Sequence, residues 1–191
     1  MKQVTINGSV RATGSKADIR AVRSEGRVPC VAYGNGIENI AFSVDAKDLQ
    51  TLTNTPYSHI VNLVVDGKEI LSTLHDVQYD PITDAAIHAD FLAISEDKPV
   101  AIRVPVVITG NSEGVKAGGK LAVSCRKLRI QGLVKDLPDE LKVDITNLKI
   151  GKRINAGDLS YDNITIISPK ATIICAVKNT RNAVAEESAE E

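Results

Sequence analysis

The residues with the clearest chemical potential are a group of cations near the N-terminus. They are Arg11, Lys16, Arg20, Arg23 and Arg27. The last four follow one another at spacings of four, three and four residues, which place side chains on one face of a helix. Like charges at these spacings repel each other in an isolated helix, so a one-sided row of cations favours an anionic partner. A charged helix face is also common on ordinary solvent-exposed surfaces, so the spacing alone leaves both interpretations open.

The charge of the chain is distributed unevenly along its 191 residues, although the net charge is only -1. Residues 1–28 carry six Lys/Arg and two acids, 29–98 carry three and eleven, 99–180 carry thirteen and seven, and 181–191 carry one and four. A basic N-terminal strip can attract a polyanion locally, whatever the overall charge. The distribution therefore keeps nucleic-acid binding open as a function.

A cluster that could serve an enzyme is formed by His75, Asp76, His88 and Asp90. Successive residues of a strand point to opposite faces, so His75 and Asp76 are not expected to serve one site. The chain has no nucleophile elbow, Walker loop or HExxH pattern. We therefore predict that the protein is not an enzyme, with no catalytic residue, metal, cofactor or small-molecule substrate.

The cysteines and the hydropathy pattern concern the compartment. Cys30, Cys125 and Cys175 are odd in number, far apart and form no CxxC pair, which argues against a disulfide framework or a zinc site. The chain starts with alternating apolar and polar residues and contains no run of eighteen apolar residues. We therefore expect a cytoplasmic protein without a membrane partner.

The first half of the chain predicts mainly strands, with two short helices. In the first strand, Val4, Ile6 and Val10 are expected on one face. Ser15 is the expected N-cap of the first helix, Gly26 its C-terminal stop, and Asp45 the N-cap of the second. Alternation and turn signals predict strands over 2–10, 29–33, 40–44, 60–65, 68–75 and 86–94, and helices over 15–25 and 45–53.

The second half predicts strands almost exclusively. The charged segment 95–99 ends in proline and separates two strand-rich regions, so we expect a domain boundary there. The fold class is therefore mainly β, with an N-terminal domain over 1–95 and an all-β domain over 96–180. The acidic tail over 181–191 is expected to be disordered, because it has too little apolar surface to offset the conformational entropy lost on folding. The predicted strands of the second domain cover 101–109, 121–130, 141–145 and 171–178.

Several motifs of the first half resemble a ribosomal family. From Arg11 to Gly34 the chain reads R-x-x-G-x-K-x-x-x-R-x-x-R-x-x-G-R-V-P-C-V-A-Y-G, followed by V-D-G-K-E-I at 65–70, H-D-V-Q at 75–78 and I-H-A-D-F-L at 87–92. This pattern is similar to the twenty-fifth protein of the bacterial large ribosomal subunit, in its long, two-domain form known as general stress protein Ctc. The second half is similar mainly in length, strand content and position.

The resemblance implies a structural ribosomal protein whose N-terminal β-barrel binds the loop E region of 5S rRNA. Other components of the large subunit are implied as partners, and the cytoplasmic ribosome as the location. Irregular RNA helices expose base edges, 2′-hydroxyls and phosphates to polar side chains, and arginines supply planar donor forks for them. The implied RNA-binding residues are Arg11, Lys16, Arg20, Arg23, Tyr33, Gln78, His88 and Asp90.

The chain departs from the family pattern close to the cation series. Ser15, Ile19 and Ala21 replace a glycine beside the lysine and a tighter arginine cluster, and Arg27 has no implied role. Two alternatives remain open. One is a protein-interaction β-module that uses the acidic middle segment, and the other is a stress-associated ribosome-binding factor.

Overall fold

The structure is a computed structural model, and it describes residues 2–95, 98–161 and 163–180. It is mainly β, as predicted, with few helices. The described residues form two compact units, unit 1 within Met1–Val100 and Leu133–Asp139, and unit 2 within Ala101–Gly132 and Glu140–Glu191. Residues 96–97 of the predicted boundary and the predicted tail 181–191 lie outside the described residues.

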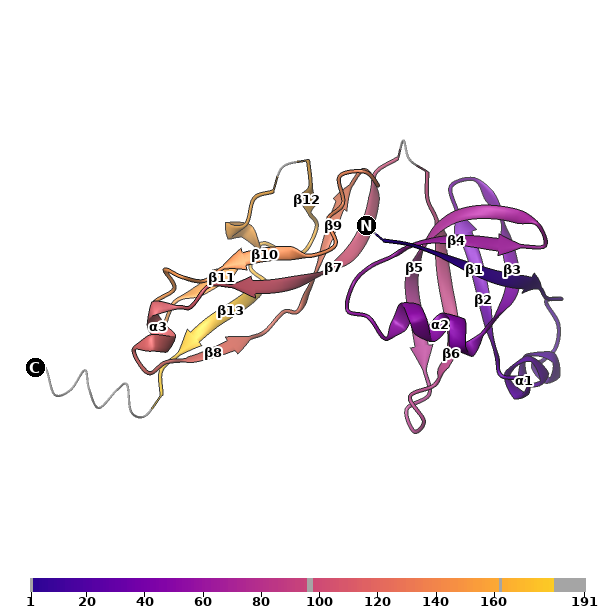
Figure 1. Ribbon diagram of the computed structural model, residues 1–191, viewed down its shortest axis with the longest axis horizontal. Helices are drawn as coiled ribbons and strands as arrows, with labels where there is room; N and C mark the ends of the chain where they lie inside the picture. The colour runs from indigo at the N-terminus through magenta and orange to yellow at the C-terminus, as the bar shows by residue number, and fades with distance from the viewer. Residues whose placement is uncertain (1, 96–97, 162, 181–191) are drawn as a thin grey trace, which may run out of the picture. The chain divides into compact units, whose positions relative to one another are not determined.

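Unit 1 is built on a closed barrel of strands in the order β1-β3-β2-β6-β5-β4 (Figure 1). Four neighbouring pairs are antiparallel, whereas β1 with β4 and β2 with β6 are parallel. Closure leaves no free sheet edge to pair with another chain. The strands are β1 (Gln3–Val10), β2 (Arg27–Gly34), β3 (Ile37–Asp45), β4 (Ile60–Val65), β5 (Lys68–Tyr79) and β6 (Ala86–Ala93).

The interior of the barrel is apolar and fully enclosed. Phe42 and Phe91 are both 0% exposed, and their ring centroids lie 5.7 Å apart. A Cβ atom at Gly8 would lie 2.7 Å from the Phe42 ring, so only glycine lets β1 pass this close to it. The helix α2 (Ala46–Thr53) contributes the buried Leu49 and Leu52 to the same core.

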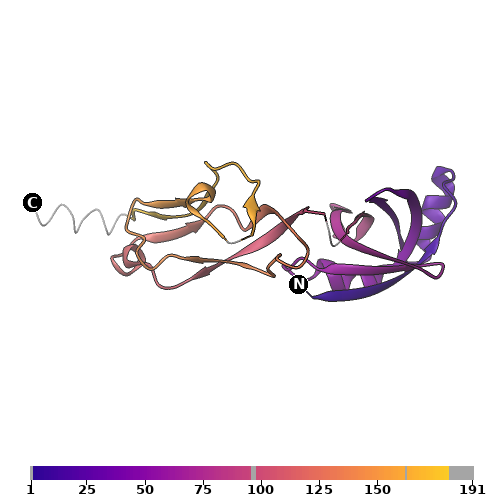
Figure 2. The same cartoon turned by 90° about the horizontal axis from the view of Figure 1, so that it is seen from above.

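The helix α1 (Lys16–Ser24) connects β1 to β2 and begins and ends as predicted. Ser15 is its N-cap, and the Asp18 carboxylate accepts a hydrogen bond from the Ser15 backbone N–H at 2.7 Å. Gly26 follows with a φ of 76°, a conformation that ends helices and favours glycine. None of the α1 residues is buried, and Figure 2 shows the helix outside the barrel strands. Its side chains are therefore available to a partner.

Unit 2 contains two sheets with the orders β10-β7-β9-β12 and β11-β13-β8. It also contains the short helix α3 (Glu113–Lys116) and a single 3-10 turn at Ala156–Asp158, so some helix occurs where only strands were predicted. The strands are β7 (Val100–Thr109), β8 (Lys120–Val123), β9 (Lys127–Gly132), β10 (Leu141–Asp144), β11 (Arg153–Asn155), β12 (Thr165–Ile166) and β13 (Ile173–Lys178).

One local prediction is wrong, and one needs detail. Val10 lies at the end of β1 opposite Phe42 of β3, in the same alternation as Val4 and Ile6, and is 53% exposed there. The single strand predicted over 121–130 is two strands, β8 and β9, which belong to different sheets. A break in the apolar alternation at Ser124 and Cys125 marks the place where the chain crosses between the sheets.

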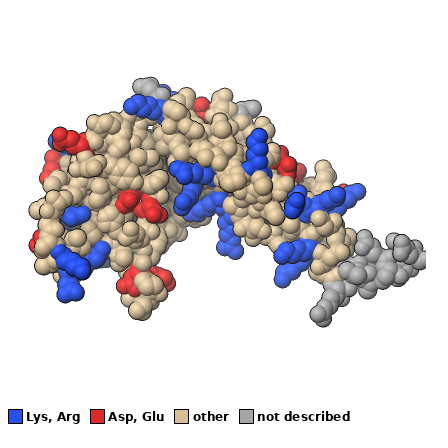
Figure 3. All heavy atoms as spheres, turned by 180° about the vertical axis from the view of Figure 1, so that it is seen from behind, with Lys and Arg blue, Asp and Glu red and all other residues tan. Residues whose placement is uncertain are grey.

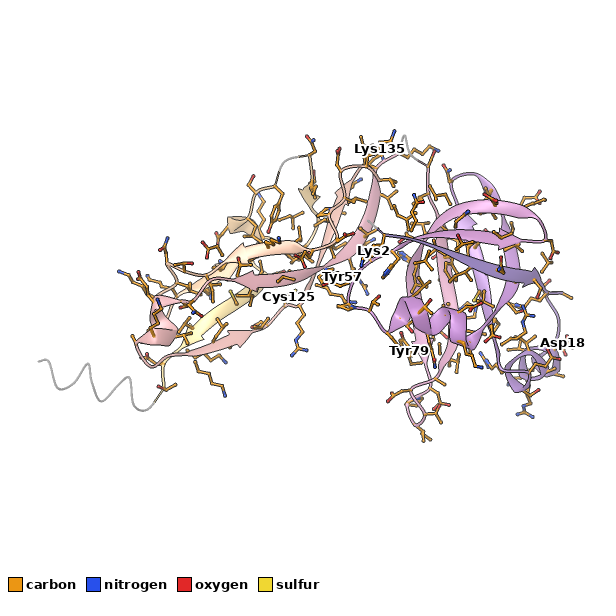
Figure 4. All side chains as sticks on the ribbon, viewed as in Figure 1. Lys2, Asp18, Tyr57, Tyr79, Cys125 and Lys135 are labelled. Carbon is orange, nitrogen blue, oxygen red and sulfur yellow. The ribbon has the colours of Figure 1, made fainter. Side chains whose placement is uncertain are left out.

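The three cysteines are free thiols. Burial raises the pKa of Cys30 to about 12 and also raises the pKa of Cys175, so both remain protonated at neutral pH. Cys125, labelled in Figure 4, is half-buried, and its Sγ donates a hydrogen bond to the carbonyl oxygen of Lys127 at 3.0 Å.

Candidate nucleic-acid interface

The outward side of α1 carries two free cations. Lys16 and Arg20 are exposed, one helical turn apart, and neither has a hydrogen-bond or ion-pair partner within the described part of the chain. A hollow of about 990 Å³ opens along α1, and Lys16, Arg20 and Arg23 contribute to its lining. These two side chains can therefore meet an anion without breaking an existing interaction.

Arg23 connects α1 to the barrel. Its Nε and Nη2 atoms donate hydrogen bonds to the carbonyl oxygen of Ile87 in β6, at 3.1 Å and 2.8 Å. The side chain remains exposed, and a guanidinium has five N–H donors, so three remain for another acceptor. Arg23 therefore fixes the helix beside the start of β6 and still presents donors outward.

Arg27 does not belong to the helical row. The helix ends at Ser24, and Arg27 is the first residue of β2, where it is half-buried. Its Nη2 atom donates to Ser9 Oγ at 2.6 Å and to the carbonyl oxygen of Ser43 at 2.8 Å. The expected four-residue spacing on one helix face is therefore wrong at its last member, and Arg27 joins three barrel strands instead.

Replacing Arg27 by alanine is expected to destabilise unit 1 rather than to remove a contact with an anionic partner. The loss of two hydrogen bonds from a charged donor should lower the free energy of unfolding by about 1–3 kcal/mol. Urea unfolding followed by circular dichroism measures this change. An unchanged unfolding midpoint would contradict the structural role, and a flatter salt dependence of RNA binding would place Arg27 among the phosphate contacts.

Arg11 follows β1 directly and is held closely against the barrel. Its backbone N–H donates to the carbonyl oxygen of Ala41 at 3.0 Å, and its side chain is half-buried. Its positive charge is close enough to Cys30 to oppose in part the rise in pKa that burial causes there. Among the described residues its Nε is one of the few buried side-chain nitrogens without an acceptor, so this atom is shielded from a partner outside the barrel.

A polar row lies on the outer side of β6 and β5. Ala89 and Phe91 of β6 point into the core at 0% exposure, so alternation directs His88 and Asp90 outward. His88 Nδ1 lies 2.9 Å from Asp90 Oδ1. Gln78 of β5 is directly opposite His88 and is exposed. These three predicted residues therefore form one continuous strip.

Tyr33 completes this strip from β2. Its neighbour across the strands is Leu92 of β6, and its ring meets that of His75 edge to face, with centroids 6.4 Å apart. Partial burial and then the charges of Asp90 and Asp76 raise the pKa of Tyr33. The phenol therefore keeps its proton and can donate a hydrogen bond to an acceptor outside the barrel.

Two residues of the strip, His75 and Asp76, were not predicted to belong to it. In the pairing of β5 with β6, Leu74 lies opposite Phe91, and the next pair is Asp76 with Asp90. His75 therefore has no partner in β6 and is the extra residue of a β-bulge. The expectation that His75 and Asp76 point to opposite faces is therefore wrong, and both are exposed on the outer side. No sequence signal marks the bulge, because it depends on the register with β6.

The cations and the polar strip form one face, which we call the α1–β6 face. It comprises α1 and the outer sides of β2, β6 and β5, and Arg23 joins its two parts. From Ile87 to Leu92 the strip runs about 17 Å at the usual rise per residue of a strand. Positive charge lies at one end and hydrogen-bonding side chains at the other, an arrangement that suits a phosphate backbone beside exposed base edges.

Comparison with known proteins shows the family to which the chain belongs. The model of the Ribosomal L25p family matches residues 6–91, and that of the ribosomal protein TL5 C-terminal domain matches residues 99–181. Relatives named large ribosomal subunit protein bL25 include that of Phocaeicola vulgatus, which is 42% identical over 189 residues, 96% of both chains. The chain belongs to the bL25 family of ribosomal proteins.

Other members of the bL25 family are similar over the same length. The protein of Azobacteroides pseudotrichonymphae is 42% identical over 183 residues, covering 96% of this chain and 97% of the relative. That of Porphyromonas gingivalis is 39% identical over 184 residues, 96% of both chains. The resemblance found in the sequence motifs is thereby confirmed, including for the second half of the chain.

The family also bears on catalysis. bL25 proteins are named as ribosomal components, which confirms the prediction that the chain is not an enzyme. Within residues 2–95, 98–161 and 163–180, no three His, Cys, Asp or Glu side chains are grouped so that they could hold a metal ion. In the same ranges, no helix has the length and apolar character needed to cross a membrane.

Proposed function

We propose that this bL25 family member is a structural constituent of the large ribosomal subunit and binds 5S rRNA through the α1–β6 face. The single observation that carries this proposal is the Arg23 side chain, which joins the cationic helix to the polar strip by two hydrogen bonds to Ile87. The names of the relatives support the large subunit as the assembly. Arg11, Lys16, Arg20, Arg23, Tyr33, Gln78, His88 and Asp90 are the proposed contacts.

The arrangement of the face supports RNA as the ligand. Lys16 and Arg20 are exposed, without partners among the described residues, and suit phosphates, whereas Arg23 is held against the barrel and offers donors at a fixed position. Arg11 is half-buried and keeps a positive charge beside the barrel. Regular A-form helices present phosphates and 2′-hydroxyls, and irregular pairs add base edges. Gln78, opposite His88, and Tyr33, opposite Leu92, can donate to and accept from such edges.

Acidic residues on an RNA-binding face need a chemical reason. Asp90 bonds His88 at 2.9 Å, so part of its charge is compensated when the imidazole is protonated. A carboxylate can also accept hydrogen bonds from the base amino groups and 2′-hydroxyls of RNA. The phosphates of RNA have no such donors. We therefore assign Asp90 and its neighbour His88 to recognition of base edges or sugars rather than of the phosphate backbone.

The proposal also covers the organisation of the chain. Residues 1–95 would form the 5S rRNA-binding domain, and residues 96–180 a second domain that contacts other components of the large subunit. The protein would then act in the cytoplasm as part of the ribosome. No reaction is involved, because its role is to hold RNA in a defined geometry.

The proposal is tested by comparing two RNAs under identical conditions. The full chain is titrated with 5S rRNA and with a regular hairpin of the same length, at several salt concentrations. We expect tighter binding to 5S rRNA at every salt concentration and a slope of log affinity against log salt of roughly -3 to -4.5 for four to five phosphate contacts. Equal binding to the two RNAs would contradict specific 5S recognition. Partner capture that resists ribonuclease would favour a protein-interaction module instead.

A further inference from the structure

A second basic surface lies on unit 2, on the outer side of the β11-β13-β8 sheet. We infer that this surface, which we call the β13 face, binds the phosphate backbone of a second RNA segment. It is defined by the exposed Lys120 of β8, Arg153 of β11 and Lys178 of β13, with Ala122 and Ala176 between them. This inference rests on the proposed function for its choice of RNA among polyanions.

The central feature of the β13 face is a pair of opposed lysines. Lys120 and Lys178 are direct neighbours across the antiparallel pair of β8 and β13. Side chains in such positions have Cβ atoms about 4.5–5.5 Å apart, and like charges there destabilise a sheet. Both lysines are exposed, and neither has an acidic partner within the described part of the chain. An anion bound between them would remove this repulsion.

The residues beside the lysines make the surface flat. Ala176 of β13 has Ala122 on one side and Arg153 on the other, in the row next to the lysine pair. Val177 and Cys175 are 1% and 0% exposed, so alternation places Ala176 and Lys178 on the outer side. Two small side chains therefore form a low floor with cations around it, which allows a polymer backbone to approach closely.

Further cations gather where this sheet ends. The backbone N–H of Val177 donates to the carbonyl oxygen of Lys152, and that of Lys152 to the carbonyl oxygen of Lys149. The helix α3, which carries Lys116, packs on the same turn, since the Gly114 N–H donates to the Leu148 carbonyl oxygen at 2.9 Å. Lys116, Lys149 and Lys152 are all exposed. The positive charge thus extends along the end of the sheet.

Three of the described acids of unit 2 have partners of their own, whereas Glu113 of α3 is exposed. Asp144 accepts a hydrogen bond from the backbone N–H of Thr146, Asp158 from that of Asn155, and Glu140 lies 3.6 Å from Lys142. On the face of unit 2 that is visible in Figure 3, the blue of Lys and Arg predominates over the red of Asp and Glu. Asp144 and Asp158 are thus engaged in local turns, and the lysines of the β13 face are left for an external anion.

The test compares two triple variants of the full chain. In the first, Lys120→Gln, Arg153→Gln and Lys178→Gln remove the β13 face. In the matched control, Lys127→Gln, Arg129→Gln and Lys142→Gln remove the same charge from exposed positions of the other sheet of unit 2. Each protein is titrated with a regular RNA duplex of about twenty base pairs, which offers backbone without irregular pairs, and separately with 5S rRNA.

We expect the β13 variant to bind the duplex at least about tenfold more weakly at low salt, with a salt dependence flatter by about two to three units. The control variant should bind the duplex within about threefold of the unchanged chain, since its cations lie outside the proposed contact. Binding of 5S rRNA should persist in both variants. Circular dichroism shows whether each variant folds.

Three results would overturn the inference. The first is an equal loss of duplex binding in both variants, and the second is that the unchanged chain does not bind the duplex. The third is that the β13 variant loses binding to a polyglutamate peptide but keeps its binding to the duplex. Failure of the proposed function is a separate result, in which the unchanged chain does not prefer 5S rRNA to a regular hairpin. A selective loss of duplex binding would still support the β13 face in that case.

Discussion

Replacing Phe42 by alanine is expected to lower the free energy of unfolding of unit 1 by about 3–5 kcal/mol. Phe42 is 0% exposed and packs against Phe91, with ring centroids 5.7 Å apart. It also lies over Gly8, where β1 has no side chain to fill the space left by the ring. The barrel is closed by hydrogen bonds on both sides of every strand, so it cannot collapse easily around the cavity.

Urea unfolding followed by circular dichroism measures the effect of Phe42→Ala, with separate transitions fitted where the two units unfold apart. Ile82→Ala is the matched control, because Ile82 is 90% exposed in the turn between β5 and β6. Its substitution should change the free energy of unfolding by less than about 0.5 kcal/mol. A loss below about 1 kcal/mol for Phe42→Ala would contradict a tightly packed barrel core.

Replacing Lys16 and Arg20 together by glutamine is expected to give the largest loss of RNA affinity. Both side chains are exposed on α1 without partners among the described residues, so their removal should leave the fold intact. Each neutralised phosphate contributes about 0.7–0.9 to the slope of log affinity against log salt, so the double variant should flatten it by nearly two units. Arg20→Ala alone should flatten it by about one unit.

The control for this double variant removes two cations from other parts of unit 1. Lys47 lies in α2 and Lys68 at the start of β5, and both are exposed. The double variant Lys47→Gln and Lys68→Gln changes the net charge equally but should leave the slope nearly unchanged. If both double variants flattened the slope to the same extent, net charge rather than the α1–β6 face would determine affinity. An unchanged slope for Arg20→Ala would remove Arg20 from the phosphate contacts.

Much of unit 1 could be predicted because its signals are local. Ser15 and Gly26 mark the two ends of α1, and Asp45 caps α2 by accepting a hydrogen bond from the Lys47 N–H. The Asp66-Gly67 turn joins β4 to β5, with Asp66 and Gly67 both at positive φ. Such features depend on a few neighbouring residues, so the sequence contains the information directly.

The features that sequence analysis missed depend on distant pairing. The parallel pair β2–β6 places Tyr33 beside β6. The register of β5 against β6 brings His75 into the strip. The carbonyl oxygen that accepts the hydrogen bond from Arg23 belongs to Ile87, which is 64 residues away in sequence. In unit 2, β11 and β12 are only three and two residues long, too short for a periodic signal.

The outer strip also shows how a local rule and a functional face can differ. Asp76 and Asp90 are direct neighbours across β5 and β6, a pairing of like charges that a sheet without a partner would avoid. Tyr79, labelled in Figure 4, is 48% exposed near the end of the same strip, where β5 meets the Asp80 turn. Exposed aromatic and like-charged residues on one face are consistent with a surface that acquires its partners on binding.

The α1–β6 face is tested most directly by amide hydrogen exchange of the full chain, alone and saturated with 5S rRNA. We predict slower exchange in α1 and in the facing parts of β2, β5 and β6, with little change in α2, β4 and the β13 face. The slowing of exchange should be largest in the peptide fragments of α1 that contain Lys16 or Arg20 and in those of β6 that contain His88. Protection confined to unit 2, or to the β1–β4 side of the barrel, would contradict the proposed interface.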